Sequence, residues 1–146
     1  MRPHPYLRAY MAGIVVPTVF LLVIMMVDAY HHYYFEVSSQ FVLGMPARPL
    51  ERAILFPMAI VPNVWGVWNM LHVALRSRVR VPLGAHGALL VLVLMPAGVA
   101  LARALDAFPI QWRFALPMAP IGMAVYYLSW KYFVGFLNEE LGIAAV

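Results

Sequence analysis

The chain has 146 residues, of which 64% are hydrophobic and only 11% are charged, with a formal net charge of +4. Soluble domains carry about a quarter charged residues, so this composition predicts a single integral membrane domain spanning residues 1–146. The absence of cysteine excludes disulfides and thiolate metal sites, and the few basic residues do not form the basic face that nucleic-acid binding needs.

Four apolar segments are long enough to cross a bilayer as helices, which takes about 20 residues. They cover residues 9–27, 53–75, 81–102 and 114–137. We therefore expect an all-α integral membrane protein whose four transmembrane helices form an up-down bundle. Lys and Arg residues favour the cytoplasmic side, and six of the ten lie near the termini, in the fourth span or in the RSRVR loop after the second span. Both termini are predicted to be cytoplasmic, in a bacterial-type inner membrane.

The end of the first span carries a group of polar residues with metal-ligand chemistry. These residues are Asp28, His31, His32 and Glu36. If the helix continues beyond the bilayer, they share a face about 140° wide. Imidazoles and carboxylates bind zinc, iron, copper or manganese, so the group predicts a divalent transition metal on the extracytoplasmic side. The alternative is an aromatic belt at the headgroup level, because tyrosine and phenylalanine residues flank the histidines.

The second span has no Asp, Glu, Lys or Arg, yet it carries a stripe of polar and aromatic side chains. The stripe consists of Pro62, Trp65, Asn69 and His72, followed by Arg76. Steps of three or four residues place these side chains on one face of a helix. An unpaired amide in hydrocarbon costs several kcal/mol, so we expect this face to meet protein and not lipid. The Trp65 indole N–H then needs an acceptor.

His72 and His86 lie near the cytoplasmic ends of two spans that the short Arg76–Arg80 loop joins. The loop predicts a tight antiparallel hairpin in which the two imidazoles face each other. Facing imidazoles, with Trp65 and Asn69 nearby, can hold a metal, a quinone headgroup or, if the spacing allows, haem. The alternative is that each histidine is a packing residue whose ring bonds to a backbone carbonyl.

Small residues recur at four-residue spacing in three of the spans, which lets helix backbones approach closely. The pairs are Ala9-x3-Gly13, Gly84-x3-Ala88, Gly98-x3-Ala102 and Ala115-x3-Ala119. Every span also contains proline, which removes a backbone hydrogen bond and kinks the helix. These features predict irregular packing, within the chain or between chains, or a cavity between kinked helices.

The sequence contains no P-loop, GxSxG, HExxH or CxxCH motif, so no reaction follows from a motif. Three hypotheses remain open. The first is an accessory subunit or scaffold that contacts other membrane subunits or itself. The second is a metal-dependent membrane enzyme that uses the Asp28, His31, His32 and Glu36 group. The third is a carrier or binder of a small apolar molecule between the second and fourth spans. In each case the arginines match the anionic headgroups of the surrounding bilayer.

Overall fold

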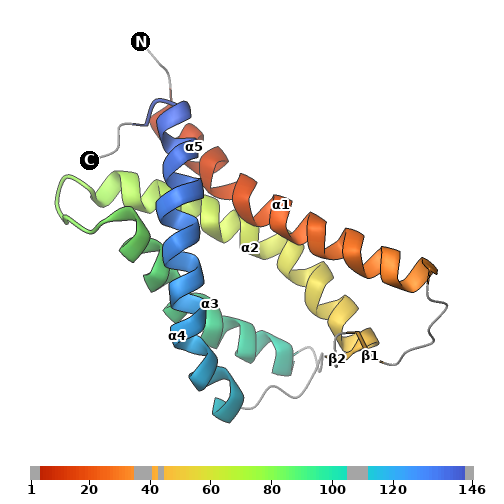
Figure 1. Cartoon of the computed structure of the whole chain (residues 1–146). Coiled ribbons are helices and arrows are strands. Elements are labelled where there is room, and N and C mark those ends of the chain that lie inside the picture. Colours follow the sequence, from red (N-terminus) through yellow and green to blue (C-terminus); the bar gives the residue numbers. More distant parts are fainter. Residues whose placement is uncertain (1–3, 35–40, 43–44, 105–111, 144–146) are drawn as a thin grey trace.

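The computed structural model describes residues 4–34, 41–42, 45–104 and 112–143 (Figure 1). This part of the chain is helical except for a short antiparallel pair of strands, β1 (Phe41–Val42) and β2 (Met45–Pro46). The long helices are α1 (Pro5–Tyr34), α2 (Ala47–Leu75), α3 (Leu83–Ala104) and α4 (Trp112–Ser129). Helix α4 continues through the π-helix η1 (Trp130–Val134) into α5 (Gly135–Glu140). The prediction of an all-helical fold is therefore confirmed.

Two helices in the described part are long and apolar enough to cross a membrane, namely Pro5–Val27 within α1 and Leu83–Ala100 within α3. Only 17% of the α1 segment and 33% of the α3 segment are buried inside the protein. A core helix of a soluble protein would be mostly buried, whereas here large side chains such as Phe20 and Met26 face outward. The exposed faces of both helices are therefore chemically suited to lipid.

The helices associate mainly as two pairs, with α1 packed along α2 and α3 packed along α4 and η1. Glycines allow both close approaches. A Cβ atom on Gly13 would lie 2.6 Å from the Trp65 carbonyl oxygen, and one on Gly66 would lie 2.5 Å from the Tyr10 ring. A Cβ atom on Gly87 would overlap the Trp130 ring. Of the glycines in the predicted small-residue pairs, Gly13 and Gly84 make close contacts within the chain and Gly98 makes none, whereas Gly66 and Gly87 lie outside those pairs.

Helices α2 and α3 contact each other only sparsely, although a short loop joins them. The predicted tight hairpin is therefore seen only near the loop, where His72 and His86 face each other, and not along the length of the two helices. The loop brings their ends together, but each helix packs along a different partner. Helix α2 makes its glycine contacts with α1, and α3 makes its own with α4 and η1.

The start of α1, the α2–α3 loop and the end of α5 gather at one end of the molecule (Figure 1). Hydrogen bonds hold this end together: Arg8 Nη1 donates to the Leu141 carbonyl oxygen at 2.5 Å, and Asn69 Nδ2 donates to the Ala9 carbonyl oxygen at 2.8 Å. Both ends of the described chain therefore lie on the same side of the bundle as the arginine-rich loop.

Candidate functional site

The polar stripe of α2 faces the protein interior. This agrees with the prediction from the free-energy cost of leaving an unpaired amide in lipid. Pro62, Trp65 and Asn69 are buried, and His72 is half-buried. Between them, on other faces of the helix, Val67 and Leu71 are exposed. The same helix therefore presents an inner face built from unusual residues and an exposed face that is apolar apart from Asn63.

Asn69 joins three helices through its side-chain amide, which is fully buried. Its Nδ2 donates to the Ala9 carbonyl oxygen of α1 and to Asn138 Oδ1 of α5, both at 2.8 Å. In return Asn138 Nδ2 donates to Asn69 Oδ1 at 3.2 Å. Because these bonds use both amide hydrogens and the amide oxygen of Asn69, this residue holds the bundle together and offers no free group to a ligand.

Aromatic rings fill the space between α2 and the α4–η1 rod. The distance between ring centroids is 4.8 Å for Trp65 and Tyr126 and 5.3 Å for Trp65 and Trp130. The centroids of Trp130 and His86 lie 6.0 Å apart. The indole N–H groups of Trp65 and Trp130 are buried and find no acceptor among the described residues. The acceptor that we expected for Trp65 is therefore not seen in this part of the chain, and its ring contacts define its position instead.

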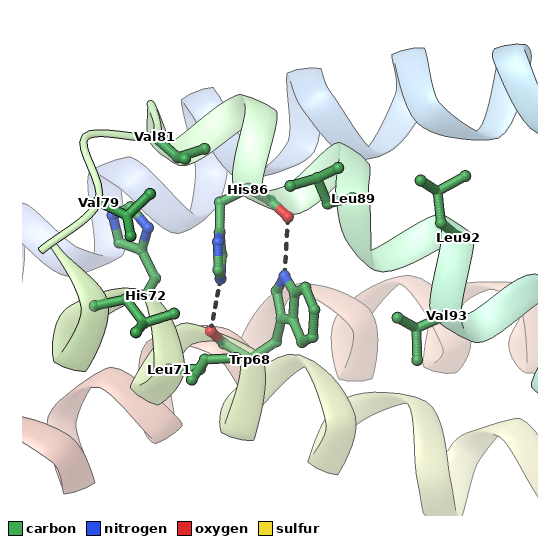
Figure 2. Close-up of a pocket in the computed structure, with 10 residues that line it drawn as sticks. Trp68, Leu71, His72, Val79, Val81, His86, Leu89, Leu92 and Val93 are labelled. Atoms are coloured by element: carbon green, nitrogen blue, oxygen red, sulfur yellow. Dashed lines mark hydrogen bonds between the residues drawn. The ribbon is translucent and has the colours of Figure 1, made fainter.

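Trp68 and His86 link α2 to α3 by a reciprocal pair of hydrogen bonds (Figure 2). Trp68 Nε1 donates to the His86 carbonyl oxygen at 2.9 Å, and His86 Nε2 donates to the Trp68 carbonyl oxygen at 3.1 Å. The two rings stack with centroids 5.0 Å apart. Because a carbonyl only accepts, Nε2 of His86 carries a hydrogen, and in the neutral ring Nδ1 is left as an acceptor. For His86 the structure thus shows the backbone bond that the packing alternative anticipates.

His72 faces His86 with ring centroids 4.8 Å apart and planes tilted by 55° (Figure 2). The His72 ring makes no hydrogen bond that is seen among the described residues, in contrast to His86. A metal ligated by one imidazole on each side would hold the centroids roughly 6 Å apart, given metal–nitrogen bonds of about 2 Å. The pair is therefore too close to sandwich a haem between its rings, but it can hydrogen-bond the polar group of a smaller ligand.

A hollow of about 410 Å³ opens between α2 and α3, next to the two histidines. Figure 2 shows the side chains that line it. They are Trp68, Leu71, His72 and Leu75 of α2, Val79 and Val81 of the loop, and His86, Leu89, Leu92 and Val93 of α3. The walls are apolar except at the end where the two imidazoles lie. Leu89, Leu92 and Val93 are 43%, 53% and 49% exposed, so the hollow opens sideways from the bundle.

The position of the hollow differs from the place where we expected a binding cavity. The aromatic rings of Trp65, Tyr126 and Trp130 occupy the space between the second and fourth helices. Of the four residues predicted to form a cofactor site, His72 and His86 line the hollow, whereas Trp65 and Asn69 do not. The sequence did hold a signal for the hollow: four residues of α2 that line it recur at helical spacing, and one of them, His72, also belongs to the polar stripe. They are Trp68, Leu71, His72 and Leu75.

The predicted metal group lies at the opposite end of α1. The helix continues to Tyr34, so Asp28, His31 and His32 do belong to one unbroken helix, as their shared face requires. Their side chains, and Glu36 altogether, lie outside the described residues. No cluster of three or more metal-ligating side chains occurs in the described ranges. The metal site stays a prediction, and metal analysis of the purified protein is its direct test.

Comparison with known proteins gives no family to which the chain can be assigned. No protein-family model matches it, and neither the curated proteins nor the solved structures yielded a match. Function must then be inferred from the site itself, since a fold alone does not imply one. The hollow between α2 and α3, with its imidazole end, is the site that the described residues support best.

Proposed function

We propose that this chain is a four-span protein of a bacterial inner membrane that binds a small amphipathic molecule in the hollow between α2 and α3. The observation that carries the proposal is the hollow itself. Its volume of about 410 Å³ falls within the range of about 300–1,000 Å³ that is typical of small-molecule sites. Such sites combine apolar walls with a few polar groups, and here His72 and His86 supply the polar groups.

The packing of the helices supports the four-span topology. Helix α2 has 29 residues, which extend over about 43 Å, and it lies along α1. This length exceeds the hydrocarbon thickness of about 30 Å. The continuous rod from Trp112 to Glu140 lies along α3 in the same way. If α1 and α3 cross the membrane, their partners lie at the same depth and cross it too.

The charges support an orientation with both termini in the cytoplasm. Arg76, Arg78 and Arg80 lie in the short loop at the same end of the bundle as Arg8. Short loops rich in arginine stay on the cytoplasmic side during insertion. The hollow then lies within the cytoplasmic leaflet of the bilayer, and the end with the two histidines lies toward the headgroups.

Selectivity in such a site comes from shape and hydrogen bonding. Lipid tails are as apolar as leucine, so the walls alone give a ligand no hydrophobic preference for the hollow over the bilayer. The ligand must fit the space between α2 and α3 and also bond to the imidazoles. His86 Nδ1 offers an acceptor, and His72 offers ring nitrogens that bond to nothing else seen in the described chain.

The test fills the hollow and asks whether a bound molecule is lost. In a filled variant, Leu89→Phe with Val93→Phe, larger side chains replace two residues of the wall. The control variant, Leu116→Phe, enlarges a side chain on α4 that is 62% exposed and lies outside the hollow. We expect organic extraction and mass spectrometry to find about one copy of one molecule per chain in the wild type and the control, and much less in the filled variant. Equal amounts of the same molecules in all three proteins would contradict the proposal.

An accessory role in a membrane assembly is a second candidate, and one feature of α3 favours it. Ala97 and Gly98 are exposed, and a Cβ atom on Gly98 would have no described atom within 4 Å apart from its chain neighbours and the adjacent backbone of α3. A flat surface of small residues suits contact with another membrane helix. We expect light scattering in mild detergent to show a dimer that Gly98→Leu disrupts. A monomer for both proteins, with no partner in pull-down experiments, would exclude this role.

A further inference from the structure

We infer that the occupant of the hollow is an anionic phospholipid, with one acyl chain lying along α3 and its phosphate at the arginine-rich loop. This identity rests on the proposed function, because it names the ligand of the same site. It is carried by the juxtaposition of three features: an apolar hollow, its opening toward the lipid, and a row of arginines at one end.

The loop between α2 and α3 contributes both to the hollow and to its charge. Val79 and Val81 line the hollow, and Arg78 and Arg80 alternate with them along the loop. Arg78 and Arg80 are exposed and form no ion pair with any described residue. Arg76 directly follows the last residue of α2, four residues after His72. Positive charge is thus concentrated where the hollow meets the loop.

This charge selects among the ligands that an imidazole pair can hold. A divalent cation at His72 and His86 would bring further positive charge close to Arg78 and Arg80, with no carboxylate among the residues that line the hollow. A phosphate group, in contrast, pairs well with arginine, whose guanidinium presents parallel N–H donors. The electrostatics therefore favour an anionic headgroup.

The shape of the hollow favours a lipid over a water-soluble anion. The wall from His86 to Val93 follows α3 for about 10 Å, pointing from the loop toward the middle of the bilayer. Leu89, Leu92 and Val93 are partly exposed, so a molecule can enter from the lipid side. A phospholipid already has this orientation in the membrane, with its headgroup at the interface and its chain directed inward.

The test uses bromine, which quenches tryptophan fluorescence on contact, because Trp68 forms part of the wall. The protein is reconstituted into vesicles of phosphatidylcholine and phosphatidylglycerol, with brominated acyl chains on one lipid at a time at equal mole fraction. The Trp68→Phe variant identifies the part of the signal that comes from Trp68. We expect brominated phosphatidylglycerol to quench Trp68 more than brominated phosphatidylcholine, with an affinity preference of at least fivefold.

Charge variants locate the headgroup. Arg78→Gln and Arg80→Gln alter exposed side chains, so they should leave the fold intact. We expect each to reduce the preference for phosphatidylglycerol about fivefold, and Arg78→Lys to retain most of it. Arg103→Gln removes the same charge at the far end of α3 and should leave the preference for phosphatidylglycerol unchanged.

The outcomes separate the lipid's identity from the existence of the site. If both brominated lipids quench Trp68 equally and the filled variant reduces this quenching, the hollow binds a chain without regard to charge, and the inference of an anionic lipid is overturned. If the filled variant leaves the quenching by both lipids unchanged, the hollow holds no specific molecule, and the proposed function fails as well. A preference that survives Arg78→Gln and Arg80→Gln together would also overturn the placement of the phosphate.

Discussion

At the scale of single residues, Asn69 shows how a polar group inside an apolar helix is used. Its position on the buried stripe follows from the sequence, because an amide left unpaired in lipid is costly. Its hydrogen-bond partners cannot be predicted from the sequence, because Ala9 and Asn138 lie 60 and 69 residues away along the chain. The choice between a ligand-binding and a structural asparagine therefore required the three-dimensional arrangement.

We predict that Asn69→Leu lowers stability. The substitution leaves the Asn138 amide buried without its partner, which costs about 1–3 kcal/mol. Unfolding in denaturing detergent, followed by circular dichroism, measures the loss. In a double-mutant cycle, Asn69→Leu combined with Asn138→Leu should cost less than the sum of the single variants. An Asn69→Leu protein as stable as the wild type, or strictly additive costs, would contradict the paired geometry.

The histidines differ in how far their roles could be predicted. Their proximity follows from two spans joined by a short loop, and the structure confirms it with centroids 4.8 Å apart. The reciprocal bonds between Trp68 and His86 could not be predicted, because they depend on the rotation of α2 and α3 about their own axes. Consecutive side chains on a helix point in directions about 100° apart, so a small rotation changes which side chains of α2 and α3 meet.

At the scale of elements, hydropathy locates the helices but not their ends. The predicted spans 9–27 and 114–137 fall inside α1 and the α4–η1–α5 rod, which extend further at both ends. The span 53–75 ends with α2, which begins six residues earlier, and the span 81–102 begins and ends two residues before α3 does. Helix α1 continues past Asp28 to Tyr34, and α2 already begins at Ala47. Hydropathy marks the segment that suits lipid, whereas backbone hydrogen bonding continues through charged and aromatic residues. The π-helix at Trp130–Val134 has no signal that we could read in the sequence.

The pairing of elements depends on glycines more than on loop length. Gly13 and Gly66 join α1 to α2, and Gly87 joins α3 to η1. The small-residue spacing predicts close approaches but not which helices make them. The short loop therefore does not make α2 and α3 pack along their length. They meet near the loop through Trp68, His72 and His86, and the hollow opens between them.

Two glycine-to-alanine substitutions on α3, one at a close contact and one at an open position, test this packing. We predict that Gly87→Ala destabilises the protein by about 1–3 kcal/mol, because its Cβ would overlap the Trp130 ring. Gly98→Ala is the matched control, since its Cβ would meet no described atom within 4 Å apart from its chain neighbours and the adjacent backbone of α3, and alanine is the better helix former. Thermal unfolding of both variants gives the comparison. Equal stability of the two would show that α3 does not pack on η1 as described.

At the scale of the whole molecule, the sequence predicts a helical membrane protein from composition alone, but not the position of its cavity. The stripe with the most unusual residues, around Trp65 and Asn69, packs into the core and binds the helices together. The hollow lies on the plainer neighbouring face, where leucines and valines resemble any lipid-facing surface. Trp68, His72 and His86 at one end, and the sparse contact between α2 and α3, distinguish that face.

The absence of cysteine makes the proposed topology directly testable. We predict that Ser77→Cys, at an exposed position of the α2–α3 loop, reacts with a membrane-impermeant maleimide only from the cytoplasmic side. Ser39→Cys, in the connection between the first two spans, should react only from the other side. Labelling of intact cells and of inside-out vesicles distinguishes the two. The reverse pattern would invert the orientation and place the hollow in the opposite leaflet.

The most direct measurement for the central proposal is photo-crosslinking from the wall of the hollow within the native membrane. A photoreactive amino acid is placed at Leu92, which lines the hollow, or at Leu116, which is exposed on α4. We predict that Leu92 yields one dominant adduct, identified by its mass, whereas Leu116 yields the mixture of lipids found in the membrane. The same lipid mixture at both positions would show that the hollow is ordinary lipid-facing surface and would contradict the proposal.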